Sequence, residues 1–174
     1  MSLLEKIQNY IPTCEQEERD KEVMIQFIRD NPNYLDRSNL IAHFTTSIWT
    51  VNKEHTKTLM AYHNIYDSWA WIGGHADGIE DLCQVALREL QEETGISSGT
   101  FSEIGRCIIK DTIYYQFLCT TDWDKTAITL QPGETTGWQW VSEEAFIAFI
   151  NSDRMIPRQH ERFRDFFRRM GYLR

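Results

Sequence analysis

An acidic helix that directly follows a glycine-rich turn is the feature that most constrains this chain. Four glutamates lie within fourteen residues: Glu80, Glu89, Glu92 and Glu93. Near a protein surface two unit charges about 4 Å apart repel by roughly 4 kcal/mol, so carboxylates this close destabilise a helix unless a cation neutralises them. Carboxylate oxygens select hard cations such as Mg²⁺ or Mn²⁺. The pattern therefore predicts a divalent-metal site on this helix.

Three of these glutamates share one face of a helix that we expect from about 81 to 94. Glu89, Glu92 and Glu93 are three and four residues apart, so they span an arc of about 100° on the helix surface. We expect the apolar face to be formed by Ile79, Cys83, Ala86, Leu87 and Leu90. The glutamates then lie beside this face, at the edge of the buried surface. Gly95 is expected to end the helix in a left-handed C-cap.

The glutamates belong to a longer pattern, complete from Gly74 to Ile96. It reads Gly-x5-Glu-x7-Arg-Glu-aliphatic-x-Glu-Glu-x-Gly-aliphatic, and it resembles the signature of the Nudix hydrolases, the MutT-like family, with no subfamily identified. An exposed and idle acidic face is the alternative, which the fixed register of Arg88 and the glycines with the acids disfavours. The preceding strand and turn, and Trp140-Val-Ser-Glu-Glu further on, extend the resemblance over roughly residues 40–153.

The resemblance implies an α+β fold, a Nudix-type α/β/α sandwich with a mixed β-sheet, and the residues before it read as an N-terminal helical extension that the family core does not explain. Residues 1–39 form this extension, and residues 40–174 form the Nudix hydrolase domain, including the C-terminal helices. Thr13 is the expected N-cap of the second helix, with Gln16 completing a capping box. Strands are expected at 41–51, 58–63, 69–72, 105–110, 112–120 and 137–141.

The activity that the resemblance implies is that of a nucleotide pyrophosphohydrolase, in which water attacks phosphorus in the diphosphate linkage of a nucleoside diphosphate derivative. Under the resemblance Glu89, Glu92 and Glu93 bind the metal, Mg²⁺ or Mn²⁺, together with the backbone carbonyl of Gly73 or Gly74. Glycine suits this position because it lets the backbone approach closely. Glu89 is alternatively the base that activates water.

Three further residues take catalytic or supporting roles under the same resemblance. Arg88 orients the glutamates by charge-assisted hydrogen bonds, which suits its fixed fork of donors. Glu80 supports the loop or binds an outer metal. Glu134, six residues before Trp140, contributes to metal binding or acts as a base, and an ordinary exposed turn residue is the alternative.

Candidate substrate contacts are less specific than the signature itself. His75 follows the glycines and is placed to touch a phosphate, Tyr114 has the spacing of a tyrosine in relatives that act on dinucleoside polyphosphates, and Trp71 is a residue that can stack on a base. For each of them an ordinary loop or core role is the alternative. Other subfamily marks are absent, so the sequence leaves the substrate open.

The net charge of −8 argues against broad nucleic-acid binding, which needs many contacts between Lys or Arg and phosphate. A small phosphorylated substrate, a nucleotide under the resemblance, remains compatible with it. The end of the chain is nevertheless basic. Arg154, Arg158 and Arg162 either steer an anion electrostatically or form the exposed face of an amphipathic last helix.

The chain offers no sign of a membrane or secreted protein. No apolar run approaches the roughly 20 residues that span a bilayer, and the N-terminus lacks a signal-peptide pattern. The four cysteines are scattered and read as reduced thiols. These are Cys14, Cys83, Cys107 and Cys119. We therefore expect a cytoplasmic protein.

Two rival functions share the expected fold. A ligand-binding or regulatory module that has lost catalysis usually lacks glutamates of the signature, and all of them are present here. An isomerase acting on an allylic diphosphate requires a cysteine acid in the strands before the signature, but none occurs between Cys14 and Cys83. The extension packs on the sandwich, completes the pocket or mediates a homodimer, and the sequence leaves these three options open.

Overall fold

The central sheet of the protein is built on one parallel pair of strands. In the computed structural model, which describes residues 1–173, β1 (His43–Asn52) and β5 (Thr112–Thr121) run parallel over ten residue pairs. β4 (Thr100–Ile109) is antiparallel to β5. On the other side, β2 (Lys57–His63) is antiparallel to β1, β3 (Ser68–Ala70) and β6 (Thr135–Ser142). The sheet is therefore mixed, as predicted.

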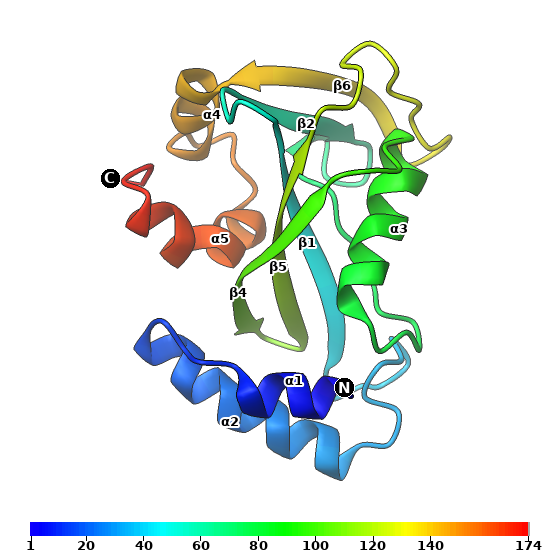
Figure 1. The fold of residues 1–174 in the computed structure, drawn as a ribbon, viewed down its shortest axis with the longest axis vertical. Coiled ribbons are helices and arrows are strands. Elements are labelled where there is room, and N and C mark those ends of the chain that lie inside the picture. The colour runs from blue at the N-terminus through cyan, green and yellow to red at the C-terminus, as the bar shows by residue number, and fades with distance from the viewer. Residues whose placement is uncertain (174) are drawn as a thin grey trace.

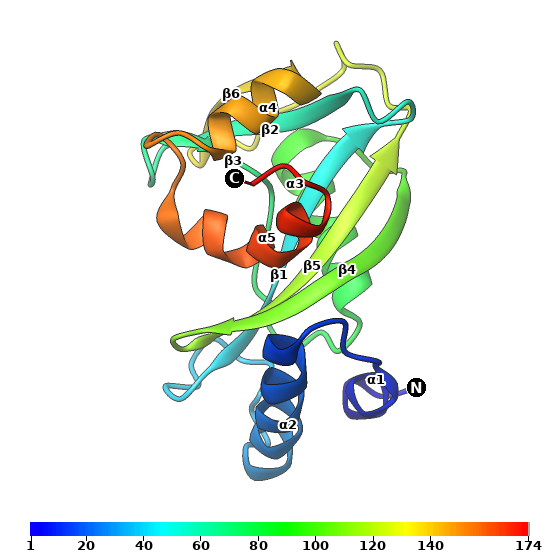
Figure 2. The ribbon, with the colours of Figure 1, turned by 90° about the vertical axis from the view of Figure 1, so that its left-hand side faces the viewer.

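Helices cover both faces of this sheet (Figure 1). Along the chain they are α1 (Leu3–Asn9), α2 (Glu15–Asp30), α3 (Leu82–Thr94), α4 (Glu143–Ile150) and α5 (Pro157–Arg169). In Figure 1, α3 lies against one face of the β1–β5 pair and α5 against the other, and α1 and α2 lie side by side at one end. Figure 2 shows the same end from the side. The predicted α/β/α sandwich is confirmed.

Two apolar cores form because successive side chains of a strand point to opposite faces. On β1, Phe44 and Ile48 enter the first core, which contains α3, whereas Trp49 and Val51 enter the second core, beneath α4 and α5. In the second core Trp49 stacks on Phe146, with ring centroids 5.7 Å apart. The sheet thus fixes the positions of α3 and α5 independently.

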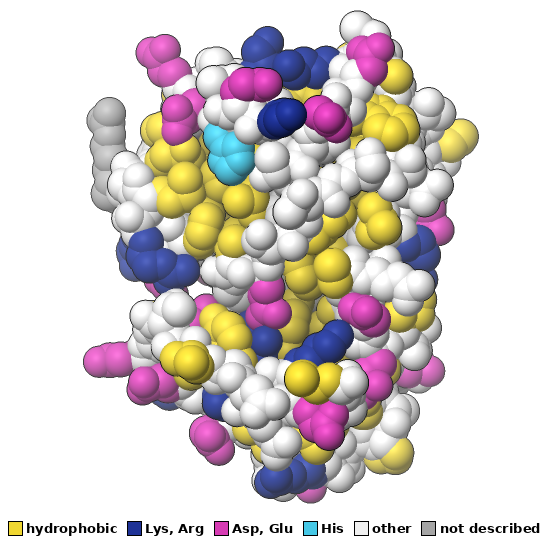
Figure 3. All heavy atoms as spheres, viewed as in Figure 1, with side chains coloured by type: hydrophobic (Ala, Val, Ile, Leu, Met, Phe, Trp, Pro, Cys, Tyr) yellow, Lys and Arg dark blue, Asp and Glu magenta, His cyan; other side chains and the backbone are white. Residues whose placement is uncertain are grey.

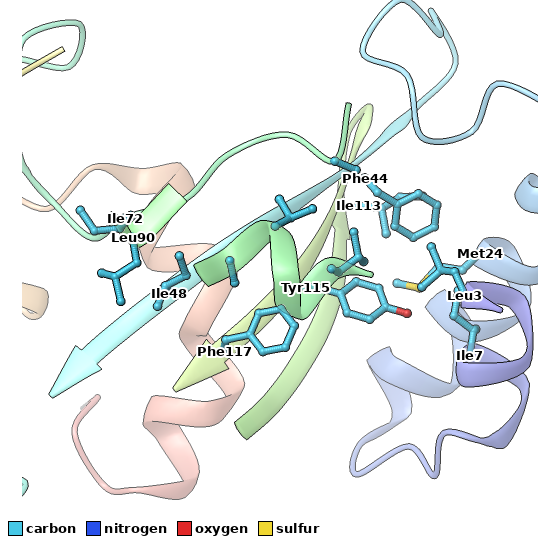
Figure 4. Packing of buried hydrophobic residues seen from close by; sticks show 14 of the residues in the cluster. Leu3, Ile7, Met24, Phe44, Ile48, Ile72, Leu90, Ile113, Tyr115 and Phe117 are labelled. Carbon is cyan, nitrogen blue, oxygen red and sulfur yellow. The ribbon is translucent and has the colours of Figure 1, made fainter. Parts of the chain in front are cut away.

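The N-terminal extension completes the first core (Figure 4). Leu3 and Ile7 from α1 are 1% and 0% exposed, and they belong to the same cluster as Met24 of α2 and Tyr115 of β5. The extension therefore packs on the sandwich, which was the first of the three roles that the sequence left open. The division of the chain at residue 39 stays a prediction.

Two local predictions were wrong. The N-cap of α2 is Cys14, which makes no side-chain cap bond. Thr13 instead donates from its backbone N–H (2.7 Å) and its hydroxyl (2.8 Å) to the buried Glu17 carboxylate, which needs both donors. Likewise β4 begins at Thr100 rather than at 105. The strand is longer than predicted because it continues on both sides of a register shift between Glu103 and Gly105.

The surface and the cysteines give little information about the function of the protein. No helix within residues 1–173 is long and apolar enough to cross a membrane. Acidic and basic side chains are interspersed on the face that Figure 3 shows. All four cysteines are free, and Cys107 and Cys119 are buried.

If the extension is part of the core, Ile7→Ala should destabilise the whole protein. Deleting a buried isoleucine side chain down to alanine costs about 2–5 kcal/mol. Ile11 is 82% exposed, so the matched control Ile11→Ala should change the free energy of unfolding by less than about 0.5 kcal/mol. Urea denaturation followed by tryptophan fluorescence measures both, and equal stabilities for the two variants would contradict the packing described.

Candidate active site

The glycine pair lies in an extended segment that pairs with the first half of β1. Thr46 N–H donates to the Gly74 carbonyl, and Ile48 N–H donates to the Ile72 carbonyl, both at 2.8 Å. In such a ladder the N–H and C=O groups of alternate residues face away from the partner strand. Gly73 is such a residue, and its N–H donates to Glu93 Oε1 at 3.4 Å. Its carbonyl therefore faces the glutamates, while the Gly74 carbonyl is engaged by β1.

Both glycines have close neighbours at the place where a side chain would begin. A Cβ on Gly74 would lie 2.1 Å from the carboxyl carbon of Glu89, and a Cβ on Gly73 would lie 2.3 Å from the carbonyl oxygen of Thr46. Such distances are shorter than any contact between nonbonded carbon and oxygen atoms. The absence of side chains thus brings α3 and β1 against the backbone of this segment.

The helix α3 is rotated relative to the sequence prediction. Its buried residues are Leu82, Val85, Ala86, Leu90, Glu93 and Thr94. Cys83, which we expected on the apolar face, is exposed. Glu93 follows Leu90 by three residues, so the two share a face. Glu93 therefore lies on the buried face and not beside it, and its side chain is only 4% exposed.

The two other glutamates of the predicted metal face differ in exposure. The Glu89 side chain is 16% exposed, and Glu92 is fully at the surface. Burial raises the pKa of Glu89, and the neighbouring Arg88 only partly offsets this. The structure thus brings Glu89 and Glu93 to the glycine segment and leaves Glu92 at its rim.

The Glu93 carboxyl group is the most perturbed acid of the site. Burial raises its pKa to about 8, the Gly73 N–H opposes this, and the charges of Glu89, Glu134 and Glu92 add to it. Its Oε2 atom is buried without a hydrogen-bond partner, which is costly unless a cation or a proton satisfies it. The nearest basic atom is Nε2 of His63, at 4.0 Å. Burial lowers the pKa of His63, so this ring is a poor counter-ion at neutral pH.

Arg88 connects the helix to the glycine segment. Its Nη2 donates to Glu89 Oε1 at 2.6 Å and to the His75 carbonyl at 3.2 Å. This geometry suits the orienting role that the sequence predicts. Glu80, by contrast, does not face the other glutamates. It accepts hydrogen bonds from the Leu3 N–H (2.9 Å) and from the Tyr34 hydroxyl (3.0 Å) of the extension.

Glu134 approaches the site from the loop before β6. Its side chain is exposed, and its charge acts on both Glu93 and His63. Its backbone carbonyl accepts from the Asn64 N–H at 2.9 Å. His63 was missed in the sequence because only the pairing of β2 with β6 brings the end of β2 to this place.

The donor set fits a hard divalent cation in part. Glu93 Oε2 is buried and unpartnered, Glu89 lies on the same helix four residues earlier, and both offer the oxygen donors that such a cation prefers. Within residues 1–173, however, no three His, Cys, Asp or Glu side chains converge closely enough to enclose an ion. A bound cation therefore needs further oxygens, from the Gly73 carbonyl, a substrate or water, to complete its coordination.

A cavity of about 300 Å³ lies on the other side of the glycine segment. It is lined by His43, Thr45, Thr46, Tyr66, Gly73, Gly74, His75, Asp111, Thr112, Tyr114, Ile156, Arg158, Gln159 and Arg162. The rings of His43 and His75 are 5.1 Å apart. The guanidinium of Arg162 lies 4.2 Å from the Tyr114 ring centre and donates to the Tyr114 hydroxyl at 3.3 Å. Arg158 and Arg162 thus face the cavity.

The three predicted substrate contacts differ in position. His75 and Tyr114 line the cavity. Burial, together with the charges of Arg37, His43 and Arg162, lowers the pKa of His75. Trp71 is only 3% exposed and packs edge-on against Phe163, with ring centroids 4.8 Å apart. Trp71 is therefore a core residue, and no face of its ring is open to a base.

A mixed sheet between two helical layers, with a glycine pair facing glutamates on one helix, defines the Nudix class of α+β domains. The chain belongs to this family, because the model of the NUDIX domain matches residues 42–166. The match begins after α1 and α2. A comparison with curated protein sequences found no match to this chain.

Similar solved structures share the fold at low identity. A NUDIX family hydrolase from Clostridium perfringens is 20% identical, with a TM-score of 0.57, over 70% of this chain and 93% of that one. MutT from Aliivibrio salmonicida and Vibrio cholerae is 18% identical, with a TM-score of 0.53, over 66% and 87%. The dihydroneopterin triphosphate pyrophosphohydrolase of E. coli is 15% identical, with a TM-score of 0.52, over 71% and 93%.

The raised pKa of Glu93 predicts a specific pH dependence of stability in the metal-free protein. Between the ordinary value of 4.5 and about 8, the folded state keeps a proton that the unfolded chain has released. The free energy of unfolding should therefore fall as pH rises through this window, with a slope of up to about 1.4 kcal/mol per pH unit. Urea denaturation in EDTA at several pH values measures the slope. Glu93→Gln should flatten it, whereas the exposed control Glu22→Gln should not.

The two glycines should differ in their tolerance of alanine. At Gly73 the new methyl group meets the backbone of β1, which cannot move without breaking the sheet, so we expect a loss of about 2 kcal/mol or more. At Gly74 it meets the end of the Glu89 side chain, which can rotate away, so the loss should be under about 1 kcal/mol. Thermal and urea unfolding measure both, and the opposite order would refute the contacts described.

Proposed function

We propose that this protein is a metal-dependent pyrophosphohydrolase that cleaves the diphosphate linkage of a nucleoside diphosphate derivative, with water attacking phosphorus. The observation that carries the proposal is the buried, unpartnered oxygen of Glu93 beside the glycine segment. Both glycines also line the cavity that Arg158 and Arg162 face, so a place for an anionic substrate adjoins the same segment. The family supports the hydrolase class.

The metal ligands that we propose are Glu93, Glu92 and the Gly73 carbonyl, and of the two alternatives for Glu89 we choose the base. Between the two glycines we choose Gly73, because the Gly74 carbonyl already accepts a hydrogen bond from Thr46. When bound, Mg²⁺ or Mn²⁺ neutralises phosphoryl oxygens, orients them and makes a coordinated water more acidic. The same charge keeps ionised the Glu93 carboxylate, whose pKa burial raises to about 8 in the metal-free protein.

Glu89 is the residue that we propose as general base. Its carboxylate is held at the segment by Arg88, and burial raises its pKa toward the pH at which it must accept a proton. A base works best when its pKa lies near the operating pH. Glu134 is the second candidate, because its exposed side chain acts electrostatically on Glu93 from the loop before β6.

The cavity supplies the substrate contacts in this proposal. Arg158 and Arg162 carry charge into it, and a guanidinium can bind two phosphate oxygens at once. His75 and Tyr114 offer further polar contacts. The volume of about 300 Å³ is at the lower end of small-molecule sites, so it suits one moiety of a nucleotide. The name of the E. coli relative, a triphosphate pyrophosphohydrolase, is consistent with a substrate of this kind.

Glu93→Gln and Glu92→Gln should each lower metal-dependent turnover by about a hundredfold or more, since each removes a proposed ligand of the catalytic ion. The assay is phosphate release over a panel of nucleoside diphosphate derivatives, with and without Mg²⁺. Circular dichroism verifies the fold, and Glu22→Gln on α2 is the matched control. Wild-type turnover in either site variant would show that the metal assignment is wrong. Nucleotide binding without hydrolysis of any compound would favour the silent binding module.

A further inference from the structure

The segment Asp77–Asp81 joins the glycine pair to α3 and sets where the helix begins. Two of its residues have left-handed backbone, Asp77 with φ 45° and Gly78 with φ 85°. This conformation is strained for the aspartate, so surrounding contacts must hold it. Asp81 then caps α3 by accepting from the Cys83 N–H at 3.2 Å. Any shift of this segment moves the glutamates of α3 relative to Gly73.

The extension holds every acidic side chain of the segment. Arg37 Nε donates to Asp77 Oδ1 at 2.8 Å, and its Nη2 forms a second bond to Asp77 Oδ2. Glu80 accepts from Tyr34 and from the first residue of α1. Lys6 pairs with Asp81 at 3.5 Å.

A backbone bond adds to these side-chain contacts. The Gly78 N–H donates to the Leu35 carbonyl at 3.2 Å, so the left-handed turn is fixed directly by the extension. All the donors and acceptors on this side come from residues 3–37, which precede the part of the chain that matches the family model. These contacts to the Asp77–Asp81 segment are therefore a feature of this chain's extension and not of the matched domain.

Arg37 is also close enough to act on the site electrostatically. Its hydrogen bond with Asp77 raises its own pKa most, and the charge of Glu89 contributes as well. In the other direction, Arg37 helps to lower the pKa of His75. The Arg37 guanidinium thus interacts electrostatically with groups of the site as well as with Asp77.

We propose that the extension is a working part of the active site, with Arg37 as a positioning residue that holds the Asp77–Asp81 segment and thereby aims the carboxylates of α3 at Gly73. The inference rests on the proposed function. An exposed ion pair contributes little to stability, so its value here lies in geometry. Misplacement of reacting groups by about 1 Å can cost a hundredfold in rate.

The test compares Arg37→Gln with Arg37→Lys and with Arg19→Gln, an exposed arginine of α2. Arg37→Gln should lower kcat by about ten- to a hundredfold with KM changed less than about threefold. Arg37→Lys should recover only part of this, because lysine lacks the bidentate fork. Arg19→Gln should match the wild type. The double variant Arg37→Gln/Asp77→Asn should be no slower than Arg37→Gln alone, since the two residues act as one unit.

Hydrogen exchange and binding of Mn²⁺ alone supply readouts that do not depend on turnover. In Arg37→Gln, amides of residues 77–85 should exchange faster while those of β5 stay protected, and Mn²⁺ should bind several-fold more weakly. Unchanged exchange, or unchanged kcat in an active enzyme, would overturn the positioning role. A wild-type protein that hydrolyses no diphosphate compound would refute the proposed function alone, and exchange and Mn²⁺ binding would then decide the positioning role.

Discussion

The burial of the Glu93 carboxyl group against the glycine segment is the interaction on which the rest of the site depends. Its Oε1 accepts from the Gly73 N–H, while Oε2 is buried without a partner. A buried carboxylate is costly unless it is paired, and the nearby glutamates increase the cost. The rotation of α3, the glycines at 73 and 74 and the orientation of Arg88 all serve to bring this group and Glu89 to one place.

Such a group lowers the stability of the metal-free fold, but it favours the binding of a cation. Functional sites often retain charged groups whose replacement would make the protein more stable. Here α3 packs through Leu82, Val85 and Leu90 into the first core. This apolar interface, which extends into α1 and α2, offsets the free energy lost by burying the carboxyl group.

The N-terminal extension contributes both to the core and to the turn before α3. It completes the first core with Leu3 and Ile7, and it holds the turn before α3 through Arg37. These two kinds of contact differ in their consequences. The apolar contacts contribute stability, whereas the exposed charged contacts mainly fix the position and rotation of α3.

The sequence by itself determined the family and many of the local elements of this protein. The spacing of the signature predicted α3, its left-handed C-cap at Gly95 (φ 78°) and the family, because these depend on residues close together in the chain. Only the tertiary structure decided that Glu93 is buried, that Glu80 faces the extension and that Trp71 lies in the core. It also decided that His63 lies near Glu93 and that Arg162 lines the same cavity as the glycines. Periodicity fixes which residues share a face, but packing against distant strands and helices decides which face is buried and which groups meet across it.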